Sequence, residues 1–139
     1  MTQEDKELLL QDLSSRLPYG VKIKLGDYDY QVCGYNSKKP LSLKIWYYYK
    51  DNSKSFIDVY LEDYRPYLRP MSDMTKEEVK EFYNVECMDA KVGYIKPTWD
   101  WHFTTNGFDW LNSHHFDYRG LIEKGLAIAV TKDNNPYKE

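Results

Sequence analysis

The sequence predicts an α+β fold: an N-terminal helix leads into a four-stranded antiparallel meander, and a helical, loop-rich C-terminal half follows. Three observations support this prediction. The first residues repeat leucine at helical spacing, and residues 21–60 alternate apolar and polar side chains between turn signals. The rest of the chain combines short helical patterns with aromatic and proline-containing stretches, which places the helices apart from the strands.

The N-terminal segment has both the start and the stop signals of a helix. Thr2 can act as an N-cap with Asp5 at the third helical position, which is a capping-box arrangement. Leucines from Leu9 onward recur at helical spacing until Pro18 and Gly20 interrupt the pattern. The segment is therefore predicted to form an amphipathic helix.

The turns set the expected strand register. Gly26 and Asp27 suit a two-residue hairpin loop, and turns at 36–40 and 50–54 would allow two more hairpins. The expected pairs are Val21 with Val32, Ile23 with Tyr30, Leu25 with Tyr28, Val32 with Leu43, Tyr30 with Ile45, Tyr47 with Ile57, and Ile45 with Val59. Because all three hairpins place apolar residues on one face, they predict a four-stranded antiparallel meander. Such a sheet should be strongly twisted, and the twist also allows a half-barrel.

Two more helices are expected after the meander. Thr75 with Glu78 forms a second capping box, and a buried stripe that includes Phe82 follows it. Asn106 suits the N-cap of a third helix, whose apolar spacing continues to His115. These patterns predict a C-terminal half built mainly from helices and loops.

The remaining C-terminal segments carry weaker patterns. Residues 65–70 contain two prolines and should be extended, and residues 92–105 read as an aromatic loop. Residues 126–130 alternate large and small apolar side chains, which is typical of a short strand at a sheet edge. The polar residues 131–139 are expected to fray. No repeat or linker divides the chain, so we expect one domain over 1–139.

The composition argues against several classes of protein. The net charge of −3 and the isoelectric point near 5.6 disfavour binding to nucleic acid by charge alone. The sequence contains neither a secretory signal nor an apolar run long enough to cross a bilayer, so we expect a cytoplasmic protein without membrane contact. Cys33 and Cys87 have no metal-like spacing and are expected to be reduced thiols. No cofactor motif is present.

Three strings resemble a family of short uncharacterised proteins. They are LLLQDLSSRLPYGV at 8–21, YRPYLRPMSDMT at 64–75 and WLNSHHFDYRGLIEKGLA at 110–127. The family recurs in Bacteroides-type genomes, often in prophage or other mobile-element settings. The resemblance implies a bacterial or phage cytosolic context and an accessory role, but it transfers no function. It is weaker over residues 22–61, so a surface there can be particular to this chain.

The first candidate site is the second face of the predicted meander, where rings and ammonium groups combine. The residues expected there are Lys22, Lys24, Gln31, Tyr35, Lys44, Trp46, Tyr48, Phe56 and Tyr60. Three interpretations stay open for this face. Helices could cover it as core, it could bind a protein, or it could stack single-stranded nucleic acid or a small ligand. The predicted binding residues are Trp46, Tyr48, Phe56 and Tyr60 with Lys22, Lys24 and Lys44.

The second candidate is a weak metal set of His102, His114, His115 and Asp117. Its spacing is poor, because adjacent histidines on a helix point about 100° apart. We therefore predict no metal site, and expect one histidine packed in the core and the other exposed.

The third candidate surrounds Asp117 and Arg119. A bidentate pair between this carboxylate and this guanidinium could fix the turn after the third helix, with Gly120 and Gly125 supplying unusual backbone angles. A structural corner is the expected role. A catalytic arginine would require an anionic substrate pocket, and the sequence has no glycine pattern that cradles phosphate.

The sequence therefore favours a non-catalytic accessory protein of a phage or mobile element that binds an unidentified protein partner through an aromatic-rich surface. Two alternatives stay open. One is a metal-dependent hydrolase built on the His102, His114, His115 and Asp117 region. The other is single-stranded nucleic-acid binding on the lysine and aromatic face of the sheet.

Overall fold

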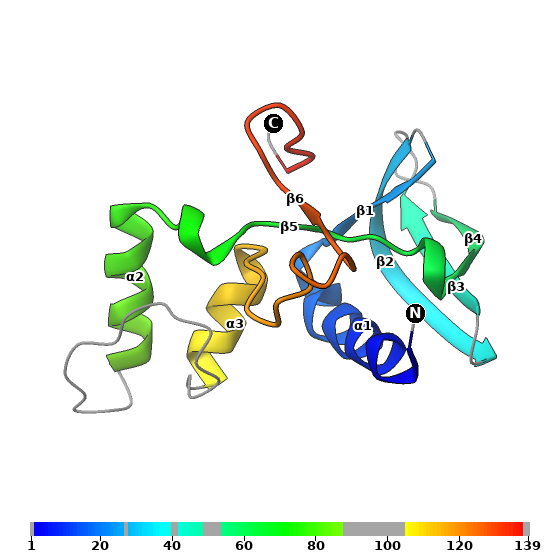
Figure 1. Ribbon diagram of the computed structural model, residues 1–139, viewed down its shortest axis with the longest axis horizontal. Coiled ribbons are helices and arrows are strands. Elements are labelled where there is room, and N and C mark those ends of the chain that lie inside the picture. The colour runs from blue at the N-terminus through cyan, green and yellow to red at the C-terminus, as the bar shows by residue number, and fades with distance from the viewer. Residues whose placement is uncertain (1, 27, 40–41, 49–53, 88–104, 138–139) are drawn as a thin grey trace.

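A computed structural model confirms the α+β class and describes residues 2–26, 28–39, 42–48, 54–87 and 105–137 (Figure 1). The helices and strands are α1 (Gln3–Arg16), β1 (Lys22–Leu25), β2 (Tyr28–Lys39), β3 (Ser42–Tyr48), β4 (Lys54–Tyr60), β5 (Tyr67–Leu68), α2 (Lys76–Cys87), α3 (Thr105–Ser113) and β6 (Ile128–Ala129). Short 3-10 turns follow α1, β4 and β5. No helix within the described ranges is both long and apolar enough to cross a membrane.

Both predicted capping boxes are confirmed. The Asp5 amide donates to Thr2 Oγ1 at 3.1 Å, and the Thr2 amide donates to Asp5 Oδ2 at 3.2 Å. Thr75 and Glu78 exchange the same two bonds at the start of α2. Because each pair satisfies two backbone donors that lack helical partners, local sequence alone sets where both helices begin. The first helix ends at Arg16, and a 3-10 turn follows it up to Gly20, which has φ of 70°.

The sheet has the predicted meander order β1-β2-β3-β4 with antiparallel neighbours, and it is open rather than closed. The first hairpin has the predicted register, with Ile23 opposite Tyr30 and Leu25 opposite Tyr28. A two-residue loop fixes which residues face each other, and this explains why this hairpin could be placed from sequence.

The other two hairpins differ from the predicted registers. Val32 pairs with Tyr47 rather than Leu43, and Ile45 pairs with Ile57 rather than Val59. The strands are longer than expected, so that β2 runs on to Lys39 through the segment assigned to a turn. Both shifts are even, so Val32 and Ile45 keep the face predicted for them, because side chains alternate with period two.

A register shift between Val32 and Gly34 changes one assignment. Beyond this irregularity Gly34 pairs with Trp46, and Tyr35 pairs with Ile45. An extra residue in one strand moves every later residue to the other face. The prediction that Tyr35 shares a face with Trp46 is therefore wrong.

The two ends of the sheet differ in what lies beside them. At the β1 end, the Lys24 amide donates to the Arg65 carbonyl at 3.1 Å and Ile23 forms a bridge with Pro66. The segment that follows leads into β5, which pairs in parallel with β6. The predicted last strand is thus only two residues long and belongs to a second, two-stranded sheet. At the other end, β4 has β3 as its one strand neighbour in the described chain.

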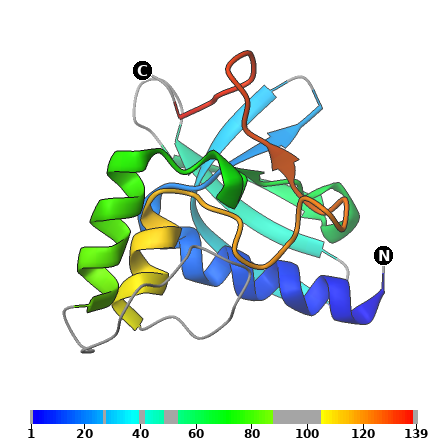
Figure 2. The ribbon, with the colours of Figure 1, turned by 60° about the vertical axis from the view of Figure 1, so that its left-hand side comes forward.

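The core has two clusters of buried apolar side chains. The larger joins α1, one face of the sheet and the segment after α3, and includes Leu9, Leu13, Ile23, Val32 and Leu121. Figure 2 shows α1 running beside the sheet on this side. The smaller joins α2 to α3 and includes Phe82, Trp110, Leu111, Phe116 and Tyr118. The segment 116–121 contributes to both clusters, so it ties the sheet half to the helical half.

The third helix and the C-terminal tail differ from their predictions. α3 begins at Thr105, so Asn106 lies inside it, and it ends at Ser113 rather than at His115. His115 has left-handed backbone with φ of 64°. The tail was expected to fray, but the Tyr137 hydroxyl donates to the Tyr67 carbonyl at 2.8 Å and accepts from the Lys22 amide at 2.9 Å. These bonds hold the chain as far as Tyr137.

Candidate functional site

Three large rings lie on the sheet face that α1 does not cover. Trp46 is 37% exposed, Phe56 49% and Tyr60 63%. Trp46 and Phe56 face each other across β3 and β4, with ring centroids 5.2 Å apart. We call Trp46, Phe56 and Tyr60 the aromatic face. Since the rings are exposed, the described helices do not bury them, and the interpretation of this face as covered core is wrong.

The charges around the aromatic face differ from those expected. Lys24 is exposed, but the ammonium of Lys22 donates to the carbonyl of Pro136 at 2.7 Å and is thereby engaged in the fold. Lys44 and Tyr48 occupy register positions on this face, and Lys44 stands opposite Asp58. Asp58 is exposed, and the sequence analysis missed it. The face therefore combines both signs of charge rather than lysine alone.

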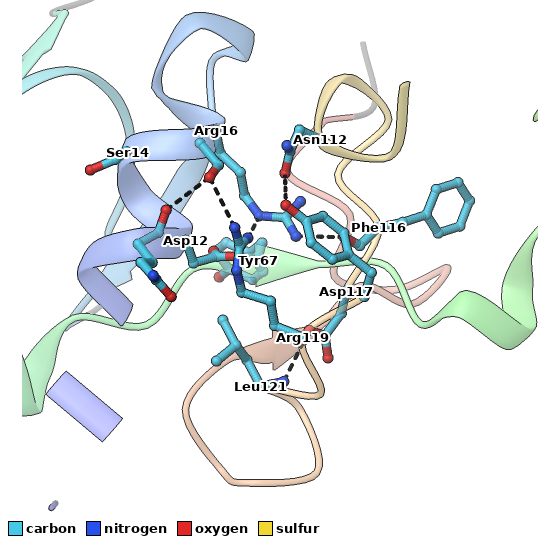
Figure 3. Close-up of polar contacts among 12 residues, drawn as sticks. Asp12, Ser14, Arg16, Tyr67, Asn112, Phe116, Asp117, Arg119 and Leu121 are labelled. Carbon is cyan, nitrogen blue, oxygen red and sulfur yellow. Dashed lines mark hydrogen bonds and ion pairs between the residues drawn. The ribbon is translucent and has the colours of Figure 1, made fainter. Parts of the chain in front are cut away.

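A second cluster of functional groups lies between α1 and the segment after α3. The third candidate of the sequence included its Asp117 and Arg119, but their link to α1 was not predicted. Asp12 and Arg16 are one helical turn apart and have no exposed surface, and Arg16 Nε lies 2.8 Å from Asp12 Oδ1. Arg16 Nη2 donates to the Phe116 carbonyl at 2.5 Å, and Arg119 Nη1 donates to Asp12 Oδ1 at 2.8 Å (Figure 3). We call Asp12, Arg16, Asp117 and Arg119 the polar junction.

Asp117 has a structural role in the polar junction. Its two carboxylate oxygens accept the amides of Leu121 and Ile122, each at 2.9 Å. Burial raises the pKa of Asp117 above its usual value, although these amide bonds oppose the shift. The predicted pair of Asp117 with Arg119 is wrong, because Arg119 reaches back to Asp12. The predicted corner does have Gly120 and Gly125 at φ of 74° and 73°.

Burial and ion pairing act in opposite directions on Arg16. Burial lowers its pKa, but the charge and hydrogen bond of Asp12, together with the smaller effects of Tyr118 and Asp117, raise it, and the net pKa is raised. The guanidinium also lies 5.3 Å from the centroid of the Tyr118 ring, and that of Arg119 lies 4.6 Å from it. Tyr118 in turn donates its hydroxyl to Asn112 at 3.0 Å. The polar junction therefore links α1 to the segment after α3 by ion pairs, while Asp12 Oδ2 and Arg16 Nη1 stay buried without a hydrogen-bond partner among the described residues.

A cleft of about 480 Å³ opens beside the polar junction, between α1 and α3. Its lining is Gln11, Ser15, Thr105, Phe108, Asp109, Asn112, Tyr118 and Arg119. Among the described residues of the lining, Arg119 is the one cationic side chain, and it is bound to Asp12 and to Ser15 Oγ at 2.9 Å. A guanidinium neutralised in this way is a poor partner for an anionic substrate.

The histidines of the weak metal set have other partners. His114 stacks on Trp110 with ring centroids 3.9 Å apart, and its Nδ1 lies 2.9 Å from the Trp110 carbonyl. His115 stacks on Tyr137 at 3.7 Å, and both histidines are half-buried, which corrects the expectation of one core and one exposed ring. Among the described residues, no three His, Cys, Asp or Glu side chains are grouped to hold a metal. His102 lies outside those residues.

Of the two cysteines, Cys33 is a free thiol in the described part of the chain. Cys33 is half-buried next to the register shift in β2, and Cys87 is the last residue of α2. The predicted aromatic loop at 92–105 lies, apart from its last residue, outside the described part of the chain.

The candidate functional groups in the described part of the chain thus form two sets. One is the polar junction, which joins parts of the fold, and the other is the aromatic face, whose rings are exposed.

Comparisons with protein-family models, with curated proteins and with solved structures find no match to this chain.

Proposed function

We propose that this chain is a non-catalytic binding protein that docks a protein partner on the aromatic face. The observation that carries the proposal is the exposure of Trp46, Phe56 and Tyr60 on one side of an open sheet. The larger core cluster lies on the other side of the sheet, and these three rings are not part of it. Grouped exposed aromatics at the surface of a soluble domain are typical of interaction sites.

The charges favour a protein partner over nucleic acid. Single-strand binders combine stacking rings with a continuous positive groove that follows the phosphates. Here Asp58 stands among the rings, and Lys22 is bound to the tail through Pro136. A mixed-charge rim around apolar rings suits a protein surface, whose own rim also carries both signs.

The mobile-element setting implied by the sequence resemblance belongs to the same proposal. An accessory protein of a phage acts on host or phage macromolecules, and a rigid sheet that displays aromatic rings can do so without an active site. A metal-dependent hydrolase receives less support, because His114, His115 and Asp117 each contact other groups of the fold.

Affinity capture from bacterial host lysate tests the proposal. The bait would be the wild type beside a Trp46→Ala, Phe56→Ala double variant, each shown to be folded by circular dichroism. Tyr28→Ala is the matched control, because Tyr28 is 69% exposed but, by strand alternation, belongs to the opposite side of the sheet. A protein retained by wild type and control, and lost by the double variant, is the expected result.

Equal recovery from all three baits would show that the aromatic face is not the docking surface. Capture of nucleic acid that disappears with added salt would instead favour the alternative function.

A further inference from the structure

The outer edge of β4 is the end of the sheet that the described chain leaves without a strand neighbour. The opposite end is different, because β1 bonds to the Arg65 carbonyl and bridges Pro66. β4 extends over seven residues, Lys54–Tyr60, and Figure 1 draws it on the side of the molecule away from α2 and α3. A strand at a sheet edge offers a row of backbone donors and acceptors that can pair with another strand.

The charge pattern of β4 determines which strand fits. Lys54 and Asp58 occupy the strand positions two residues before and two residues after Phe56, and alternation assigns these three positions to one face. Native edges often carry charged side chains, especially lysine, which oppose pairing with another strand. This edge carries one charge of each sign at equal spacing from a ring, so it complements itself when reversed.

We propose that β4 pairs antiparallel with β4 of a second copy of this chain, with Phe56 opposite Phe56 at the two-fold axis. Lys54 of each copy then stands opposite Asp58 of the other. An interface of this kind uses the same patch on both subunits, as two-fold symmetry requires. Pairing centred on Ile57 would instead set Phe56 against Asp58, so the charges select the Phe56 register.

The pairing would extend the aromatic face across the axis. Within one copy Trp46 lies 5.2 Å from Phe56, and the second copy contributes the same pair on the other side. The result is a row of four rings on one continuous sheet. This inference rests on the proposed function only for the use of that row, since the pairing of the two edges requires no partner.

Charge exchange at the two positions tests the register. Asp58→Lys sets two lysines opposite each other twice in the dimer, and Lys54→Asp does the same with two aspartates. Either change replaces two attractive cross-strand pairs in the dimer by two repulsive ones, so it should weaken dimerisation about ten- to hundredfold. The double variant Lys54→Asp, Asp58→Lys restores both attractions and should dimerise like the wild type.

Sedimentation velocity over micromolar to millimolar concentration is the measurement. The two single variants should each be monomeric where the wild type is dimeric, and their equimolar mixture should form a heterodimer. Asp133→Lys is the control, because Asp133 is exposed in the tail and undergoes the same change of charge.

A wild type that stays monomeric over the whole range overturns the inference, as does a dimer that none of the charge changes weakens. Failure of the proposed function would look different. In that case the wild type dimerises and responds to charge exchange, but the Trp46→Ala, Phe56→Ala variant captures the same proteins as Tyr28→Ala.

Discussion

The polar junction and the aromatic face are each built from side chains that are costly in the place where they lie. The junction buries charge, and the face exposes rings. A buried charge is tolerated only when its partners are fixed, and here Asp12 is bound by both Arg16 and Arg119. Exposed rings have no such requirement from the fold. The difference teaches that the buried charges of this molecule contribute to its stability, whereas its exposed rings are available to contact another molecule.

The largest effect is expected from Asp12→Asn. The amide keeps the size of the side chain but leaves Arg16 buried, and Arg119 nearly so, without an anion between them. Removing one member of a buried ion pair costs about 3–5 kcal/mol, and chemical denaturation would measure this loss in the free energy of unfolding. Asp109→Asn makes the same change at an exposed position of α3 and should cost less than about 0.5 kcal/mol.

If the two variants proved equally stable, the junction would contribute no more than a surface pair. The buried charges of the junction would then not be what stabilises the contact between α1 and the segment after α3.

An intermediate effect is expected from pH at His115, which lies between the junction and the tail. Burial first, and then the positive charges of Arg16, His114, Arg69 and Lys22, lower its pKa from 6.5 to about 4. Between these values the unfolded chain binds a proton that the folded chain does not, so stability falls as the pH drops from 6.5 towards 4. The loss is at most about 3 kcal/mol, because the ring is not fully buried.

The measurement is urea denaturation at several pH values with wild type and His115→Asn. Asparagine tolerates the left-handed backbone at this position and does not titrate. The variant should lack the part of the acid sensitivity that His115 supplies, while the carboxylates contribute equally to both proteins. Identical pH slopes for the two would contradict the assigned pKa.

The smallest effect on stability is expected from Trp46→Ala. The ring is 37% exposed and its packing partner on the aromatic face is Phe56, so the free energy of unfolding should fall by less than about 1.5 kcal/mol. Phe82→Ala, at a fully buried ring of α2, should cost about 3–5 kcal/mol in the same assay. A loss at Trp46 as large as that at Phe82 would mean that the aromatic face belongs to the core.

The sheet was predictable to the extent that its signals are local. The loop at Gly26 fixes the first hairpin within two residues, and alternation then assigns most later side chains to the right face. The lengths of the other hairpins are not encoded by alternation, since a shift of two residues satisfies the same pattern. The irregularity after Val32 leaves no signal in the sequence, and it misplaced Tyr35.

The polar junction was not predicted because its partners are far apart in the chain. Arg119 bonds to Asp12 across 107 residues, whereas the carboxylate expected from the sequence was that of Asp117. One signal was present. Leu9, Asp12, Leu13 and Arg16 occupy one stripe of α1, so two opposite charges stand at positions that a helix buries.

The contact between Arg16 and the Phe116 carbonyl also has a consequence for how the chain folds while it is being synthesised. Helix α1 has two buried charges, and both have further partners about a hundred residues later in the chain. Until residues 116–119 emerge, Asp12 and Arg16 are paired only with each other, and the leucine stripe beside them lacks Leu121. The packing of α1 therefore cannot be completed before residues 116–121 have been synthesised. Until then its leucine side chains are incompletely buried, and the chain depends most on protection from aggregation.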